Sequence, residues 1–255
     1  MKEAKPSLYT SLSPALLQLY DVSSSIVVII DVLRATSTIA TVLFNGAKNI
    51  IPVDSVAECI RIGKQIEGVT AGERDGHVAE GLVHGNSPFE YPGEFISGKT
   101  LVLTTTNGTK LLHMALDRGA KGIITGSFVN LSAVCDYLIA ANMPVILGCA
   151  AWKDRVNIED TLFAGAVISR IKSHFNINCD SSQMAETMYG DAKKDLYEFM
   201  KSKNASHYER LTKYGLEKDI RYCLTTDVAN VLCMYEGGKL IKVESYSTSH
   251  EKESV

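Results

Sequence analysis

Ile26-Val27-Val28-Ile29-Ile30 leads directly into Asp31-Val32-Leu33-Arg34-Ala35-Thr36-Ser37-Thr38, and this junction decides the fold. The apolar run is short and rich in β-branched residues, which predicts a strand buried on both faces of a parallel sheet. Residues 34–43 predict a helix. Open parallel sheets bind ligands at the carboxyl ends of their strands. Asp31 and Arg34 therefore predict a site for a cation, an anion or both, although Asp31 could instead cap the following helix.

The composition is that of an ordinary globular protein. The 255 residues are 45% hydrophobic and 22% charged, with a formal net charge of −3 and no basic run, so the footprint of a nucleic-acid-binding protein is missing. The apolar stretches fall far short of a membrane span, and the N-terminus lacks a hydrophobic signal segment. The six cysteines form no Cys-x-x-Cys pair, which favours reduced thiols. We expect a cytoplasmic protein that binds neither nucleic acid nor membrane.

Predicted strands and helices alternate over the first two thirds of the chain. The predicted strands are Ile26–Ile30, Asn49–Val53, Val69–Gly72, Leu101–Thr104, Gly122–Thr125 and Val145–Leu147. Helices are predicted near 35–44, 55–66, 110–118, 131–141 and 159–172. This alternation predicts an α/β fold with a mostly parallel sheet and helices on both faces. We expect one domain over 1–255, with at most a smaller helical and strand sub-domain after about residue 175, where two strands could close around Gly237-Gly238.

Most polar motifs stand where a predicted strand ends. They are Gly72-Glu73-Arg74, Gly85-Asn86-Ser87-Pro88, Thr104-Thr105-Thr106-Asn107-Gly108-Thr109, Gly126-Ser127 with Asn130, Gly148-Cys149-Ala150 and Glu159-Asp160. Because parallel strands point the same way, we expect these segments to gather on one edge of the sheet, where a rigid scaffold positions its loops.

Each motif also has an ordinary structural explanation. The turn over residues 105–109 could bind an anion through its backbone N–H groups, or it could be a capped turn in which Asn107-Gly108 supplies a positive φ. Asn86-Ser87-Pro88 could be a turn leading into a helix. Glu73 and Arg74 could form a surface ion pair.

The acidic pair and the cysteine leave similar alternatives open. Glu159-Asp160 is a favourable acidic start for a helix, and adjacent carboxylates are also a common way to hold magnesium. Cys149 could be a nucleophile, but a small buried cysteine is the commoner role, and no histidine is obviously placed to activate it. His77 and His84 are by default solvent-facing, although either could act as a general acid.

Taken together, these motifs resemble the 2-phosphosulfolactate phosphatase family. The resemblance covers residues 26–171 strongly, through six ordered motifs, and residues 208–240 more loosely, through Arg210-Leu211, Gly215-Leu216 and Asp219-Ile220. One departure is Leu82-Val83, where many members carry a Phe-Asp-like pair ahead of Gly85.

The resemblance implies a magnesium-dependent phosphatase with a family-specific α/β fold. The family hydrolyses 2-phospho-3-sulfolactate to 3-sulfolactate and phosphate, a step on a route to coenzyme M. The residue types suit such an anionic substrate, because carboxylates can hold Mg²⁺ while arginines and N–H or O–H donors bind oxyanions. The expected metal ligands are Asp31, Glu73, Glu159 and Asp160. Asp31 and Arg34 are the expected catalytic residues, and the expected substrate-binding residues are Arg74, Asn86, Ser87, Thr105, Thr106, Asn107, Gly108, Thr109, Asn130 and Cys149.

Several mechanisms and functions remain open at this point. We favour attack by water bound to magnesium, with Asp31 as a ligand, over an aspartyl-phosphate on Asp31, since Leu33 replaces the second aspartate of haloacid-dehalogenase-type phosphatases. A phosphocysteine on Cys149 ranks third. The alternatives to the family reaction are hydrolysis of another small anionic phosphomonoester and a non-catalytic sensor of such a metabolite. A homodimer is left open.

Overall fold

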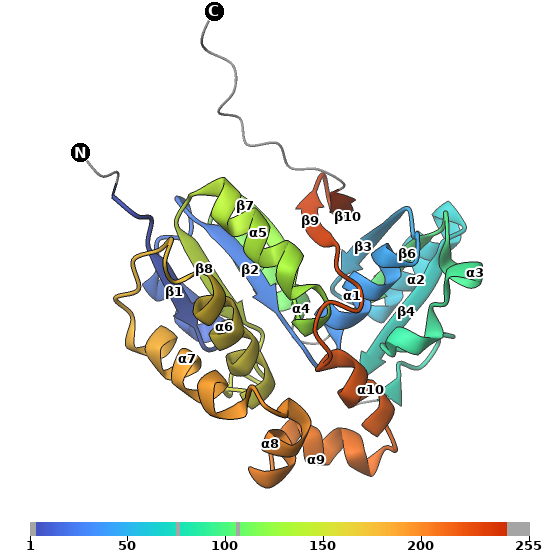
Figure 1. Cartoon of the computed structure of the whole chain (residues 1–255). Helices are drawn as coiled ribbons and strands as arrows, with labels where there is room; N and C mark the ends of the chain where they lie inside the picture. The colour runs from blue at the N-terminus through green and yellow to red at the C-terminus, as the bar shows by residue number, and fades with distance from the viewer. Residues whose placement is uncertain (1–3, 75–76, 106–107, 244–255) are drawn as a thin grey trace, which may run out of the picture.

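A computed structural model describes residues 4–74, 77–105 and 108–243 (Figure 1). The strands are β1 (Leu8–Ser11), β2 (Ile26–Ile30), β3 (Asn49–Val53), β4 (Val69–Arg74), β5 (His77–Val78), β6 (Thr100–Thr104), β7 (Gly122–Gly126), β8 (Val145–Cys149), β9 (Leu232–Glu236) and β10 (Lys239–Val243). The α-helices are α1 (Ala35–Phe44), α2 (Val56–Ile66), α3 (Gly93–Ile96), α4 (Gly108–Asp117), α5 (Leu131–Ala141), α6 (Ile158–Ile171), α7 (Asp180–Ala192), α8 (Leu196–Ser202), α9 (Ser206–Lys213) and α10 (Glu217–Cys223). Short 3-10 helices are η1 (Pro14–Leu19), η2 (Pro88–Glu90) and η3 (Phe128–Asn130).

The sheet consists of two parallel groups joined by an antiparallel hairpin. Within the described residues the strand order is β1-β8-β2-β7-β9-β10-β3-β6-β4-β5. β1, β8, β2 and β7 are mutually parallel, as are β3, β6 and β4. The β9–β10 hairpin pairs antiparallel with β7 on one side and with β3 on the other. The predicted α/β fold with a mostly parallel sheet is confirmed, and the hairpin that we expected to close the chain fills the middle of the sheet.

β2 is buried along its whole length, as its sequence predicts. It lies between β7 and β8, and alternate side chains face different cores. Val28 and Ile30 pack with α5 and α6, whereas Val27 and Ile29 pack with α4. A strand buried on both faces needs apolar residues at every position, because each face contributes burial of roughly 1.5–3 kcal/mol per Val or Ile side chain.

The second half of the sheet carries its own helical cover. α1 packs on β3, β6 and the hairpin through residues such as Ile39 and Leu43. α2 packs on the opposite face, where Cys59 meets Val53 and Val102. Ser55 caps α2 by accepting a hydrogen bond from the Glu58 N–H. Helices therefore cover both faces, as predicted.

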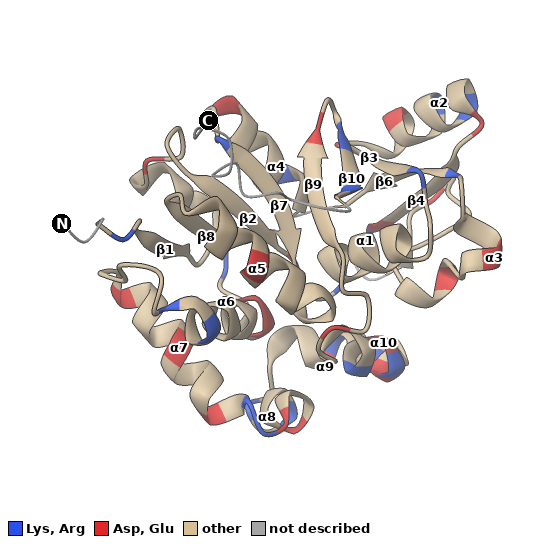
Figure 2. Cartoon of the chain, turned by 45° about the horizontal axis from the view of Figure 1, so that its top comes forward, with Lys and Arg blue, Asp and Glu red and all other residues tan. Residues whose placement is uncertain are grey.

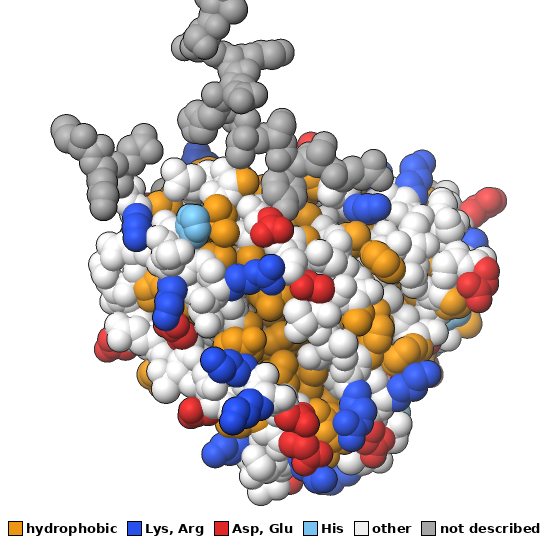
Figure 3. Space-filling model, viewed as in Figure 1, with side chains coloured by type: hydrophobic (Ala, Val, Ile, Leu, Met, Phe, Trp, Pro, Cys, Tyr) orange, Lys and Arg blue, Asp and Glu red, His pale blue; other side chains and the backbone are white. Residues whose placement is uncertain are grey.

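α6 and α7 pack closely against each other, because glycine stands at their contact. A β-carbon on Gly165 would lie 2.0 Å from the carbonyl oxygen of Ala185. Charged side chains lie mostly on the outer helices and the loops (Figure 2), and acidic and basic side chains are interspersed on the face in Figure 3. In the part of the chain that the structure describes, no helix has the length and apolar character needed to cross a membrane.

The last three helices lie across the end of the sheet toward which β2 and β4 point (bottom of Figure 1). Ile220 and Cys223 of α10 are fully buried in the core of the first half. The Tyr222 hydroxyl also lies 2.9 Å from the Thr41 hydroxyl of α1. The predicted C-terminal helices thus pack onto the main body and cover the edge that carries the polar motifs.

Candidate active site

Asp31, at the carboxyl end of β2, is the centre of a group of acids. The pKa of Asp31 is raised to about 6, chiefly by burial and also by the nearby Glu73 and Glu159 carboxylates, while His207 opposes the shift. These neighbours come from β4, α6 and α9. The structure thus brings two other predicted metal ligands, Glu73 and Glu159, close to the Asp31 carboxylate.

Asp160 joins two loops at this edge. Its Oδ1 accepts a hydrogen bond of 3.0 Å from the Val32 N–H, and its Oδ2 accepts one of 3.1 Å from the Ala151 N–H. Burial raises the pKa of the Asp160 carboxyl well above its ordinary value, and Glu159 and Asp31 raise it further. Asp160 therefore holds the segments after β2 and β8 against each other, in addition to any role toward a metal.

Glu159 has a partner that the sequence did not reveal. Nδ1 of His207 lies 2.5 Å from Oε1 of Glu159, and the two side chains are 12% and 1% exposed. Arg210 belongs to α9, as His207 does, and its guanidinium stacks over the Trp152 ring at a distance of 4.4 Å. α9 therefore contacts both the start of α6 and the loop that follows β8.

Gly108 leaves a small space that polar atoms surround. A β-carbon on Gly108 would stand 3.4 Å from Asp31 Oδ2 and 3.4 Å from Thr105 Oγ1. Thr105 Oγ1 is buried and has no hydrogen-bond partner among the described residues. Gly108 also begins α4, whose N-terminus favours negative charge. This space beside Asp31 therefore suits an oxyanion.

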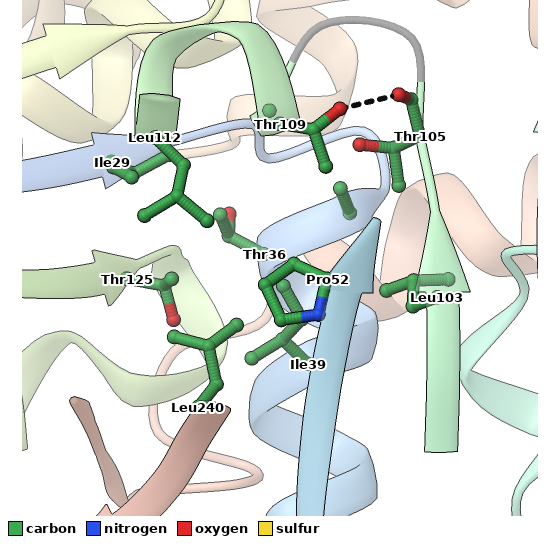
Figure 4. A pocket seen from close by; sticks show the side chains of 12 residues that line it. Ile29, Thr36, Ile39, Pro52, Leu103, Thr105, Thr109, Leu112, Thr125 and Leu240 are labelled. Carbon is green, nitrogen blue, oxygen red and sulfur yellow. Dashed lines mark hydrogen bonds between the residues drawn. The ribbon is translucent and has the colours of Figure 1, made fainter. Parts of the chain in front are cut away.

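Beneath the turn, the packing is apolar (Figure 4). Thr109 donates a hydrogen bond of 2.7 Å to the Thr105 carbonyl, which fixes the turn. The cavity below has a volume of about 30 Å³, and Ile29, Pro52 and Leu112 are among its lining residues. Since about one water occupies such a volume, this cavity is too small for a larger ligand. Thr106 and Asn107, also predicted to bind substrate, lie outside the described residues.

Arg34 stands at the wall of a larger pocket. Its Nη1 lies 2.5 Å from Asp219 Oδ2 of α10, and both side chains are buried. The pocket has a volume of about 250 Å³, and Arg34, Asn86, Ser87, Tyr214 and Leu216 are among its lining residues. Asn86 Oδ1 is buried and has no hydrogen-bond partner among the described residues. Three residues predicted to touch the substrate therefore share one pocket.

Arg74 and Ser87 are held by local hydrogen bonds. Arg74 donates from Nη2 to Thr104 Oγ1 at 3.0 Å and from Nη1 to its neighbour's carbonyl at 2.7 Å. Ser87 Oγ accepts a hydrogen bond from the Phe89 N–H, and Glu90 accepts one from the Ser87 N–H. The turn that we gave as the alternative for residues 86–88 is therefore present, and it forms part of the pocket wall.

The Asn130 side chain is hydrogen-bonded within the core, and Cys149 is buried there. The Asn130 amide donates to the Thr125 and Val231 carbonyls and accepts from the N–H and hydroxyl of Ser127, which leaves no capacity for a substrate. Cys149 is fully buried, and burial, followed by Asp160 and Glu159, raises the pKa of its thiol well above the ordinary value. This environment opposes the thiolate that a nucleophile needs.

The carboxylates suit magnesium in kind but form no ready-made cage. Among residues 4–74, 77–105 and 108–243, no three His, Cys, Asp or Glu side chains are arranged to hold a metal together. Magnesium prefers hard oxygen ligands, keeps several waters, and often binds through one or two carboxylates plus substrate phosphates. Carboxylate oxygens are ligands of the kind that Mg²⁺ prefers, and a cation beside Asp31 would relieve its repulsion with the neighbouring Glu73 and Glu159 carboxylates.

Comparison with known proteins identifies the family. The family model described as 2-phosphosulpholactate phosphatase matches residues 11–238. The chain belongs to the 2-phosphosulfolactate phosphatase family. These proteins are phosphoric monoester hydrolases, and all the acids around Asp31, together with His207 and Asp219, lie within the matched residues.

Relatives named "Probable 2-phosphosulfolactate phosphatase" match most of the chain. The protein of Thermotoga petrophila is 42% identical over 218 residues, which cover 85% of this chain and 92% of the relative. That of Caldanaerobacter subterraneus subsp. tengcongensis is 38% identical over 222 residues, covering 86% and 90%. That of Clostridium acetobutylicum is 33% identical over 224 residues, covering 86% and 93%. The family resemblance inferred from the motifs is therefore confirmed over almost the whole chain.

Two residues near the site were not predicted to belong to it, and Asp219 appeared only within the looser part of the family resemblance. His207 comes from α9 and Asp219 from α10, and both helices start more than 170 residues beyond Asp31. The available signal was weak: Asp219 stands next to the core residue Ile220 on a predicted helix, and His207 directly precedes the loosely matching segment. A buried carboxylate on such a helix needs a cationic partner, and Arg34 provides one.

Proposed function

We propose that the protein is a magnesium-dependent phosphatase that hydrolyses 2-phospho-3-sulfolactate to 3-sulfolactate and phosphate. Family membership supports the reaction class, and the names of the relatives support the substrate. The observation that carries the proposal is the space at Gly108. The Asp31 carboxylate, the N-terminus of α4 and a Thr105 hydroxyl that has no partner among the described residues meet there.

Asp31 would hold the metal, together with a carboxylate from among Glu73, Glu159 and Asp160. Bound magnesium would neutralise charge on the phosphoryl oxygens and lower the pKa of water near the phosphorus. His207 keeps Glu159 in one orientation through the contact at Oε1. Asp160 keeps the loops that carry this site in register through its two backbone contacts.

The remaining donors would bind the substrate's negative charge. The first N–H groups of α4 and the Thr105 hydroxyl face the phosphate, and they act without adding charge to the protein. Arg34 faces the second pocket, where another acidic group of the substrate would lie. Phosphoryl transfer depends mostly on such positioning and charge stabilisation.

Two routes for the nucleophile follow from the position of Asp31. We favour direct attack of water on phosphorus with Asp31 as a metal ligand, and the alternative is a covalent aspartyl-phosphate. A single turnover in ¹⁸O-labelled water separates them. Label found directly in phosphate supports the favoured route, whereas label in the Asp31 carboxylate would overturn it.

The function itself is tested by phosphate release from a panel of acidic phosphomonoesters. We expect 2-phosphosulfolactate to be turned over with the highest kcat/KM, and we expect chelator to abolish the activity and added Mg²⁺ to restore it. Equal turnover of all esters would remove the specific substrate. Binding without turnover of any ester would contradict the phosphatase and favour a sensor.

A further inference from the structure

Arg34 is fixed by an acid from a distant helix. Its Nη1 contacts Asp219 Oδ2 at 2.5 Å, with the two side chains 5% and 7% exposed. A buried guanidinium retains four other N–H donors, so this pairing fixes its orientation and leaves donors for a ligand. The pair therefore sets which way Arg34 faces.

α10 does not depend on this ion pair for its position. Ile220 and Cys223 are fully buried, and Tyr222 reaches the Thr41 hydroxyl. Asp219 is the first-turn acid of α10 that points inward to Arg34, whereas Glu217, in the same turn, is only partly buried. Anchoring of the helix is thus supplied by other residues, and Asp219 is available for a separate role.

The pocket beside Arg34 has the donors that a compact oxyanion needs. Arg34 contributes a guanidinium, Ser87 a hydroxyl, and Asn86 an amide whose Oδ1 has no partner in the described part of the chain. Rotation of this amide would present its NH₂ group instead. Tyr214 and Leu216, from the loop between α9 and α10, also line the pocket. His77 and Glu90 also line the pocket, and the Glu90 carboxylate accepts hydrogen bonds from the Gly85 and Ser87 N–H groups. A single-charged sulfonate or carboxylate would bind the guanidinium and the neutral donors.

We propose that Asp219 is a positioning residue: it holds Arg34 so that the guanidinium binds the acidic group of the substrate that is not cleaved. This inference rests on the proposed function, because it assumes that the phosphate binds near Asp31. Asp219 acts only through Arg34 and does not touch the reacting atoms. The pocket thereby selects phosphoesters that carry a second oxyanion.

The test compares Asp219→Asn with Glu217→Gln, which removes the same charge from the same turn of α10. We expect Asp219→Asn to raise KM for 2-phosphosulfolactate at least about tenfold and to change kcat less than about threefold. Glu217→Gln should leave both unchanged. An unchanged KM in a folded Asp219→Asn protein would overturn the proposal.

A double-variant comparison shows whether the effect passes through Arg34. In an Arg34→Lys background, adding Asp219→Asn should change kcat/KM less than about twofold, because the guanidinium to be positioned is already gone. A full additive loss would overturn the proposal. If Asp219→Asn does not fold, Asp219→Glu keeps the charge but lengthens the side chain, and an unaltered KM in that variant would also overturn it.

The first of two further measurements shows whether the pocket binds the sulfonate or the carboxylate of the substrate. The second distinguishes failure of this inference from failure of the proposed function. 2-Phospholactate keeps the carboxylate and lacks the sulfonate. If its KM is insensitive to Asp219→Asn, the pocket binds the sulfonate, and an equal rise assigns the carboxylate. Calorimetry with 3-sulfolactate needs no turnover: we expect a Kd at least about tenfold weaker in Asp219→Asn, and equal Kd values would overturn the inference. Absence of phosphate release by the wild type would contradict the proposed function alone.

Discussion

The imidazole of His207 lies 2.5 Å from the carboxylate of Glu159, although 48 residues separate them in the chain. Glu159 belongs to the first turn of α6, beside Asp31, and His207 belongs to α9. The contact shows that the C-terminal helices complete the acidic site, since neither the sheet nor its first seven helices supply a partner for this carboxylate among the described residues.

Asp160→Asn should weaken both the fold and the response to magnesium. An amide has one acceptor oxygen, so one of the two N–H groups that Asp160 accepts from would face an NH₂ group and lose its hydrogen bond. We expect a loss of about 1–3 kcal/mol in the free energy of unfolding and a strongly raised Mg²⁺ concentration for half-maximal activity. Urea unfolding and metal titration measure the two effects. Asp136→Asn, exposed on α5, is the control, and an Asp160→Asn protein with unchanged metal dependence would reassign Asp160 to loop structure alone.

Gly108→Ala should lower the activity without lowering the stability. The added methyl group would meet its nearest neighbours at 3.4–3.8 Å, which is ordinary contact, so we expect the melting temperature to stay the same or rise. The methyl group would nevertheless occupy the space between Asp31 and Thr105. We expect kcat/KM to fall at least about tenfold, which corresponds to about 1.4 kcal/mol. Full activity in this variant would show that the substrate does not use this space.

Gly165→Ala and Gly190→Ala form a matched pair for stability. A methyl group at Gly165 would collide with the Ala185 carbonyl, whereas nothing lies within 4 Å of one at Gly190. We expect Gly165→Ala to cost at least about 2 kcal/mol through overpacking. Gly190→Ala should add about 0.5–1 kcal/mol, because alanine is the better helix former. Chemical denaturation checks both, and equal effects would contradict the close packing of α6 on α7.

The raised pKa of Asp31 should make the stability of the fold depend on pH. Its pKa of about 6 in the fold exceeds the value of about 3.9 in an unfolded chain. Because the folded protein holds the proton on such a carboxyl more tightly than the unfolded chain does, protonation stabilises the fold fully below about pH 4. This stabilisation is lost as the pH rises through 6. In chelator, we therefore expect Asp31→Asn to match the wild type at pH 4 and to exceed it at pH 7.5 by up to about 3 kcal/mol.

Thermal melting at both pH values, in chelator, measures this difference. Asp117→Asn, an exposed acid of α4, is the control and should show no pH-dependent gain. A wild type that stays as stable as Asp31→Asn at pH 7.5 would show that Asp31 is not forced to ionise against its neighbours.

Strands and helices whose ends are marked by their own residues could be predicted from the sequence. β2 and α1 have the predicted bounds, since a β-branched run and a helix-ending Asn45-Gly46 mark them without help from distant residues. β1 was missed because only Leu8 of its four residues is strongly apolar. The place of the β9–β10 hairpin could not be derived either, because its sequence specifies a hairpin but not which strands it joins.

The same division applies to the site. Asp31 and Glu159 were found because each stands at a predicted strand or helix end, and the structure brings them together. Asp219 and His207 lie in helices whose sequences look like ordinary polar surface, and only tertiary packing buries them. Asn130 shows the opposite case: its position after β7 predicts a ligand contact, and in the structure its amide donates to backbone carbonyls of the core. The role of each remaining residue toward substrate and metal stays a prediction.

The central position of the β9–β10 hairpin affects the order in which the chain can fold during synthesis. β7 and β3 present unpaired edges to each other until residues 232–243 have left the ribosome, because the hairpin pairs with both. Unpaired strand edges are templates for association between chains. Once β7 and β8 have been synthesised, the nascent protein therefore carries two open half-sheets until the hairpin follows, and a chain truncated shortly before residue 232 should be prone to aggregate.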